Sequence, residues 1–306
     1  MHPASGNGRP PAMPFRRAQD SWRTRLSACF RHGLPALLLL CLATPLPAGP
    51  PAASPGGTVR LALVNVPDEL LRPMLPDFEK ETGLRAEIVY TGSDPYGFAR
   101  EGKADLVISH FGHAGVEPFV TEGLGLWPRA VFSNQMALIG PPADPAGIRG
   151  MSDAARALRR IADTGSPFLA NHQAGARYLE EILWLAAGVK EKGSWYLDTG
   201  ARGGRAVNEA AEKGAYLLWG LPPFLRFRRE NPVDLVPLVT ADPVFQRMMV
   251  SVVVSPEKIA GVNADGAKAF QDFLVAPATQ ARVRAFRYPD FEGQAWWPAG
   301  RENSRE

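Results

Sequence analysis

The stretch TVRLALVNVPDELLRPMLPDFEKETGLRAEIVY, residues 58–90, predicts one complete strand–helix–strand unit. Its first nine residues, 58–66, are dense in β-branched and aliphatic side chains, which is typical of a buried strand. Apolar residues at helical spacing follow, and Gly83 supplies the stop. Two internal prolines, Pro73 and Pro76, predict that this helix is irregular or broken. The last seven residues of the stretch predict a second strand.

The same alternation of strands and helices continues through the rest of the chain. It predicts α/β layers with largely parallel sheets, which bind ligands where strand ends meet helix N-termini. The connector 141–150 is rich in turn residues and is a candidate domain boundary. Strands are predicted over residues 104–109, 134–140, 167–171, 215–220, 234–239 and 248–255, and a strand or turn over 194–200. Helices are predicted over residues 116–123, 152–165, 174–188, 204–214 and 264–277, and Ser152 is the expected N-cap of the second of these.

The first 53 residues are expected to be a leader that takes no part in the fold. Five arginines between residues 16 and 31 precede an apolar run from Leu34, and the small residues of PPAAS (residues 50–54) follow it. This order is typical of a secretory signal peptide. The apolar run is shorter than the roughly 20 residues of a membrane span, although an uncleaved N-terminal anchor is the alternative. We therefore expect an exported, soluble, periplasmic protein.

Setting this leader aside changes the composition from which function is inferred. Both cysteines, Cys29 and Cys41, lie in it, so the remainder offers no disulfide and no thiol nucleophile. Six of the 34 basic residues and one of the 31 acidic residues also lie there. The remainder therefore has 28 basic and 30 acidic residues, a net charge of −2 where the whole chain has +3, and no nucleic-acid partner is expected. No Gly-x-Ser-x-Gly elbow, phosphate-binding loop or His-Glu-x-x-His motif occurs, so we expect no enzyme.

From Phe78 onward the chain resembles the tungstate-type solute-binding proteins of ABC importers. The resemblance implies an α/β, two-lobed type II periplasmic-binding-protein fold with a two-strand hinge and an interlobe ligand cleft. It places lobe one at residues 54–139 plus 246–306, lobe two at 140–245, and the hinge at 134–142 and 242–250. The segments that carry it run in unbroken order: FEKETG, GKADLVISH, FVTEGLG, ALIGPPADPAGIRG, AARALRRIADTGSPF, WLAAG, WYLDTG, NEAAEKGAYLL, DLVPLV and AKAFQDFLVAP.

The same resemblance implies a monomer that delivers a small solute or oxyanion to an ABC permease of the inner membrane, without a cofactor. A periplasmic sensor that hands ligand occupancy to a membrane receptor would share this fold and cleft. The two roles differ in their gene neighbours, because permease and ATPase genes indicate import and a histidine kinase gene indicates sensing.

The chain departs from the family where the ligand is implied to bind. After the first strand the family has a Thr/Ser-rich stretch, but here LVNVPDE offers Asn65 and a carboxylate that repels anions, Asp68. The family's Arg-Gly-Asp-Asp-Ser-Gly-Thr segment is here NHQAGAR, with Asn171 at the arginine position. Charge-assisted hydrogen bonds contribute about 1.5–3 kcal/mol each, so tungstate and molybdate should bind much more weakly than in the family. We expect another small anion or a chelate.

The candidate ligand groups are the polar residues that the resemblance and the strand ends place near the cleft. TGSD, after the second strand, loosely keeps the family's Gly-Thr-Gly. The glycine-rich turn before residues 204–214 presents two arginines where helix N-termini favour anions, or else it is a plain turn with solvated arginines. The candidates are Asn65, Thr91, Ser93, His110, His113, Asn171, His172, Gln173, Arg202 and Arg205.

Three of these candidates are histidines that follow strands of different lobes. His110 matches the family's histidine, His113 is extra, and His172 would approach from lobe two. We expect the three to line one cleft. Because neutral imidazole suits Zn, Ni or Cu, an alternative function is transition-metal binding by His110, His113 and His172. Otherwise they are histidines hydrogen-bonded to the backbone.

Overall fold

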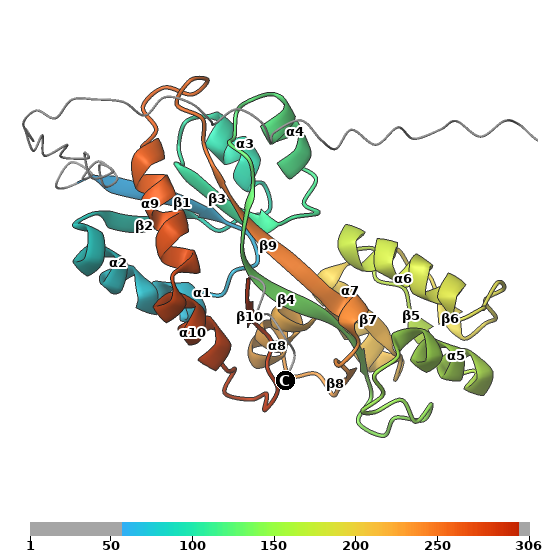
Figure 1. Ribbon diagram of the computed structural model, residues 1–306. Helices are drawn as coiled ribbons and strands as arrows, with labels where there is room; N and C mark the ends of the chain where they lie inside the picture. The colour runs from blue at the N-terminus through green and yellow to red at the C-terminus, as the bar shows by residue number, and fades with distance from the viewer. Residues whose placement is uncertain (1–56, 300–306) are drawn as a thin grey trace, which may run out of the picture. The chain divides into compact units, whose positions relative to one another are not determined.

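The computed structural model describes residues 57–299 (Figure 1). The expected leader, with both cysteines, lies outside this range. Within residues 57–299, no helix combines the length and the apolar character that crossing a membrane requires.

The strand–helix–strand unit at the start of this range forms as predicted. It comprises β1 (Thr58–Leu63), α1 (Asp68–Leu71), η1 (Arg72–Met74), α2 (Leu75–Thr82) and β2 (Arg85–Tyr90). The break in the helix follows from Pro73 and Pro76, which occupy the first turns of η1 and α2, where a missing N–H is tolerated. Gly83 then ends α2 in the left-handed conformation, with φ of 72°.

The largest sheet has the strand order β10–β4–β9–β3–β1–β2. The other strands in this order are β3 (Leu106–His110), β4 (Arg129–Gly140), β9 (Gln246–Val253) and β10 (Trp297–Pro298). β1 pairs in parallel with β2 and β3, but β9 pairs antiparallel with both β3 and β4. The expectation of largely parallel sheets is therefore wrong. The sheet is mixed because β4 and β9 run side by side in opposite directions between the two halves of the fold (Figure 1).

β4 belongs to both halves of the fold. Its residues 129–135 pair with β9, and residues 136–140 pair with β7 (Leu217–Gly220) and β8 (Val236–Val239). β5 (Phe168–Leu169) and β6 (Tyr196–Leu197) form a separate two-stranded parallel sheet. Two long strands thus connect the two α/β halves, as the sequence implied.

Helices cover both halves of the fold. The first half has α3 (Pro95–Arg100), α4 (Val116–Thr121), α9 (Ala264–Val275) and α10 (Pro277–Ala285). The second half has α5 (Ala154–Thr164), α6 (Ala174–Ala186), α7 (Gly203–Glu212) and α8 (Leu221–Glu230). The short turn η2 (Pro243–Phe245) leads into β9. The N-cap of α5 is Asp153, whose side chain accepts the Arg156 N–H, and not the predicted Ser152. α3, α8 and α10 were not predicted, although each has proline at its first or second position, a known start signal.

An ion pair with a buried carboxylate holds β1 and β3 together. The carboxylate of Asp105 is fully buried and accepts the backbone N–H of Arg60 at 2.7 Å and its guanidinium at 2.6 and 3.1 Å. It also accepts the Asn263 N–H, just before α9, at 2.9 Å. The hydrogen bond with Asp105 raises the pKa of Arg60. The ion pair therefore fixes the start of β3 beside the middle of β1, and the loops that follow these two strands contribute to the candidate site.

Candidate functional site

A cavity of about 660 Å³ lies where β1 and β2 end. This volume is within the usual range for small-molecule sites, about 300–1,000 Å³. Five of the predicted site residues line it: Asn65, Thr91, Ser93, His113 and Gln173. The rest of the lining comprises Leu63, Val64, Val66, Asp68, Glu69, Arg72, Gly92 and Arg226. The lining therefore combines the loops after β1, β2 and β3 with Gln173, the N-cap of α6, and Arg226 of α8.

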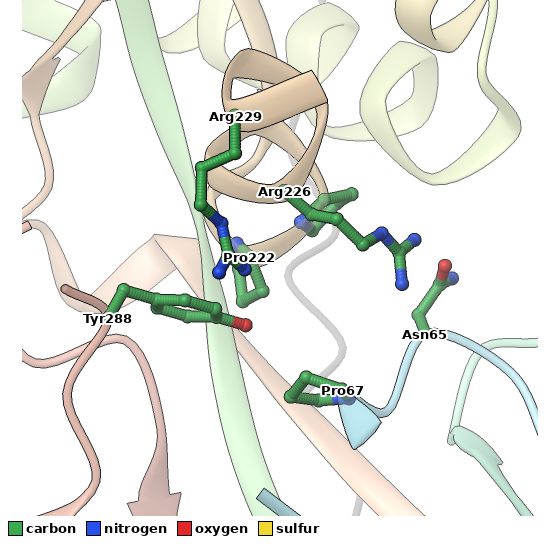
Figure 2. Close-up of a pocket in the computed structure, with 7 residues that line it drawn as sticks. Asn65, Pro67, Pro222, Arg226, Arg229 and Tyr288 are labelled. Carbon is green, nitrogen blue, oxygen red and sulfur yellow. The ribbon is translucent and has the colours of Figure 1, made fainter. Parts of the chain in front are cut away.

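A small crevice adjoins this cavity between the β1–α1 loop and α8 (Figure 2). With a volume of about 10 Å³ it has room for about one water molecule. It shares Asn65 and Arg226 with the cavity and adds Arg229 and Tyr288. We therefore treat the crevice as an extension of the cavity.

Asn65 is held in an uncommon backbone conformation at the edge of the cavity. Its φ is 58°, in the left-handed region that asparagine tolerates better than most residues. The preceding residue, Val64, donates its N–H to the Ile108 carbonyl at 3.0 Å, which fixes the end of β1 on β3. Figure 2 shows the Asn65 amide and the Arg226 guanidinium facing each other. Such a conformation next to a cavity is consistent with a functional role.

The charged residues around the cavity are paired, with one exception. The Arg72 Nε donates to Asp68 Oδ2 at 2.7 Å, and Arg229 donates to Glu69 Oε1 at 3.2 Å. Arg226, on α8, makes no hydrogen bond or ion pair with any residue that the structure describes. Its guanidinium is therefore available to a ligand.

His113 lines the cavity, but both nitrogens of its ring are already used. Nδ1 accepts the Gly115 N–H at 3.0 Å, and Nε2 lies 3.2 Å from the Ser93 carbonyl oxygen. This network assigns the proton to Nε2, which donates to Ser93, so the ring is neutral in this arrangement. His113 therefore helps to hold the loop after β3 on the loop after β2.

His110 lies among the connecting strands and does not line the cavity. Its Nε2 is 3.3 Å from the side-chain nitrogen of Asn134 on β4, and its backbone pairs with Met249 on β9. Burial lowers the pKa of His110 to about 4, with a smaller contribution from Arg247. A neutral imidazole packed between β3, β4 and β9 has a structural role at the connection.

Asn171 and His172 position the second half of the site. Asn171 is fully buried, and its Oδ1 accepts the N–H groups of Gln173 at 3.1 Å and Gly203 at 3.0 Å. These two hydrogen bonds hold the starts of α6 and α7 together. The Nε2 of His172 lies 2.5 Å from the Asp198 carboxylate, outside the cavity lining.

The predicted arginines lie outside the cavity. Arg202 is the exposed N-cap of α7, and Arg205 is held by Glu209 at 3.7 Å and by the Gly200 carbonyl at 3.2 Å. Arg226, the unpaired arginine of the cavity lining, was missed because α8 itself was not predicted. A Pro-Pro pair at the start of LPPFLRFRRE could have indicated this helix.

His110, His113 and His172 do not form one metal-binding group among the described residues. In the part of the chain that the structure describes, no group of three or more His, Cys, Asp or Glu side chains could hold a metal ion. The physical reason is that each ring has its own partner: Asn134 for His110, Ser93 for His113 and Asp198 for His172. The three-histidine metal site therefore does not form in this structure, and only His113 lines the cavity.

An α/β fold with two connecting strands and a polar cavity lined by residues of both halves is the arrangement of a two-lobed binding protein. Residues 59–288 match the model of the family described as bacterial extracellular solute-binding protein. The chain belongs to this family and has its two-lobed fold. Members of the family are non-enzymatic transport components, which confirms the interpretation as a non-enzyme.

The chain is also similar to individual proteins named for anions. It is 31% identical, over 69% of its length, to a Haloferax volcanii protein provisionally named as the anion-binding protein of an ABC transporter, and it spans 63% of that protein. It is 28% identical, over 70% of its length, to the tungstate-binding protein TupA of Peptoclostridium acidaminophilum, of which it spans 75%.

Two solved structures extend this similarity to the fold. The tungstate-binding protein TupA of Desulfovibrio alaskensis matches with a TM-score of 0.66 and 26% identity, over 80% of this chain and 100% of that chain. The tungstate ABC transporter of Geobacter sulfurreducens matches with a TM-score of 0.62 and 26% identity, over 75% and 98% of the two chains. The expected resemblance to tungstate-type solute-binding proteins is confirmed.

Proposed function

We propose that the chain is the extracytoplasmic solute-binding component of an ABC-type importer and binds a small anion in the cavity at the end of β1. The names of its relatives support an anionic ligand. Its partner is then an inner-membrane permease, which it reaches as a periplasmic monomer after export. A sensor role would use the same cavity, and the gene neighbours distinguish the two.

The observation that carries the proposal is the unpaired guanidinium of Arg226 opposite Asn65 (Figure 2). A guanidinium presents five N–H donors in a planar fork that matches carboxylate and oxyanion geometry. The hydroxyls of Thr91 and Ser93 and the amide of Gln173, which begins α6, supply further donors around the cavity. In this proposal Arg226 of α8 takes the place of the arginine that the resemblance implies at position 171.

We further propose that residues 54–139 plus 246–306 and residues 140–245 act as two lobes that close on the ligand. β4 and β9 connect these groups of elements, and the cavity is lined by residues of both. Small-angle scattering with and without a bound anion tests this motion. An unchanged scattering profile, despite binding shown by calorimetry, would contradict it.

The proposal is tested by a thermal-shift screen of anions followed by calorimetry on the full chain. Loss of one charge-assisted hydrogen bond of about 1.5–3 kcal/mol predicts that Arg226→Gln binds the anion about 10- to 150-fold more weakly. The matched control is Arg205→Gln, since Arg205 lies outside the cavity and should leave affinity unchanged. Equal affinities in the wild type and Arg226→Gln would refute the proposal.

A further inference from the structure

We infer that this cavity selects singly charged anions over doubly charged anions of the same shape, and that Glu69 sets this preference. The inference rests on the proposed function, because it concerns the ligand of the same cavity. It differs from the sequence-based expectation, which concerned lost donors and not the number of charges.

The first step is the balance of charges that line the cavity and its crevice. Three guanidinium groups, Arg72, Arg226 and Arg229, face two carboxylates, Asp68 and Glu69. Asp68 pairs with Arg72, and Glu69 pairs with Arg229. A single positive charge, that of Arg226, is left for a ligand.

The neighbouring titratable and basic groups add no second charge to this lining. His113 is neutral in this arrangement because its Nδ1 accepts the Gly115 N–H. Arg247 lies on β9, outside the lining, and donates to the carbonyl groups of Val244 and Gln246. A dianion in this cavity would therefore retain one uncompensated charge close to two carboxylates that are each about half exposed, at 49% and 50%, and this repulsion between like charges is unfavourable.

The second step concerns Glu69, which holds a second guanidinium away from the ligand. Arg229 and Arg226 are one turn apart on α8 and both line the crevice. Arg229 is engaged on two sides, by the Glu69 carboxylate at 3.2 Å and by the ring of Tyr288, whose centroid is 5.4 Å from its guanidinium carbon. Removing the Glu69 charge should leave two uncompensated guanidinium groups on one helix face. The preference should then shift toward dianions.

The test compares perrhenate with tungstate, two tetrahedral oxyanions that differ in charge, by calorimetry on the full chain. The variants are Glu69→Gln and, as a matched control, Glu122→Gln, which removes the carboxylate of another arginine pair, with Arg100. Thermal midpoints measured without anion check that each variant is folded. Perchlorate and sulfate, which are also tetrahedral, form a second pair with one and two charges.

We expect the wild type to bind perrhenate about tenfold or more tightly than tungstate, the effect of one charge-assisted contact. Glu69→Gln should move the ratio of the two affinities about tenfold toward tungstate, and Glu122→Gln should leave the ratio unchanged. Tighter binding of dianions by the wild type, or an unchanged ratio in Glu69→Gln, would overturn the inference and leave the anion-binding proposal standing. No binding of any of the four anions would overturn both.

Discussion

Replacing Asn171 by alanine separates a positioning role from direct ligand contact. The substitution removes Oδ1, which accepts two backbone N–H groups at the starts of α6 and α7, and a longer hydrogen bond from Nδ2 to the Leu218 carbonyl at 3.4 Å. Each lost hydrogen bond costs about 1 kcal/mol. With a small cavity left in a fully buried position, the free energy of unfolding should fall by about 2–3 kcal/mol.

Urea unfolding in the absence of any anion measures this loss. Asn208→Ala, at an exposed position of α7, is the matched control and should change the free energy of unfolding by about 0.5 kcal/mol or less. An Asn171→Ala variant of unchanged stability but weakened anion binding would refute the reasoning. It would return Asn171 to the ligand role that the sequence suggested.

Three further predictions concern the structure around the cavity. Burial lowers the pKa of His110 to about 4, so the unfolded chain binds a proton at this residue more readily than the folded chain does. The free energy of unfolding, measured by urea titration, should therefore fall by up to about 3 kcal/mol as the pH is lowered from 6.5 to 4. His110→Gln should flatten this dependence on pH. Asp105→Asn removes the carboxylate charge that pairs with Arg60, so the free energy of unfolding should fall by about 3 kcal/mol. The thermal midpoint should fall with it, and an unchanged midpoint would contradict this prediction. Gly115→Ala places Cβ 2.5 Å from the Tyr96 ring and should lower the free energy of unfolding by about 1–3 kcal/mol. Gly112→Ala, where the added Cβ has nothing within 4 Å, should leave it nearly unchanged in the same assay.

Most strands and helices were predictable because local sequence encodes them. Apolar spacing, the prolines at the starts of η1 and α2 and the left-handed Gly83 account for the first unit without any tertiary information. Strand direction was not predictable in the same way. The apolar runs of β4 and β9 have the same pattern whether they pair in parallel or antiparallel, and only the tertiary connection decides it.

The candidate site was predictable in part, for a related reason. Asn65, Thr91 and Ser93 follow strand ends, and strand ends meet at one edge of a sheet. His110 ends β3 and Asn171 follows β5, but their side chains turn into the protein, and sequence position does not specify that orientation. Arg226 lies in the middle of a helix, where nothing in the local sequence distinguishes it from its neighbouring arginines.

The most direct measurement is a crystal structure of the full chain grown with perrhenate, in which anomalous scattering locates the rhenium atom. The account predicts one strong peak in the cavity, with perrhenate oxygens within hydrogen-bonding distance, about 2.7–3.2 Å, of the Arg226 guanidinium, and no such peak in Arg226→Gln. A peak at the start of α7, beside Arg202 and Arg205, or an empty cavity in the wild type, would contradict it.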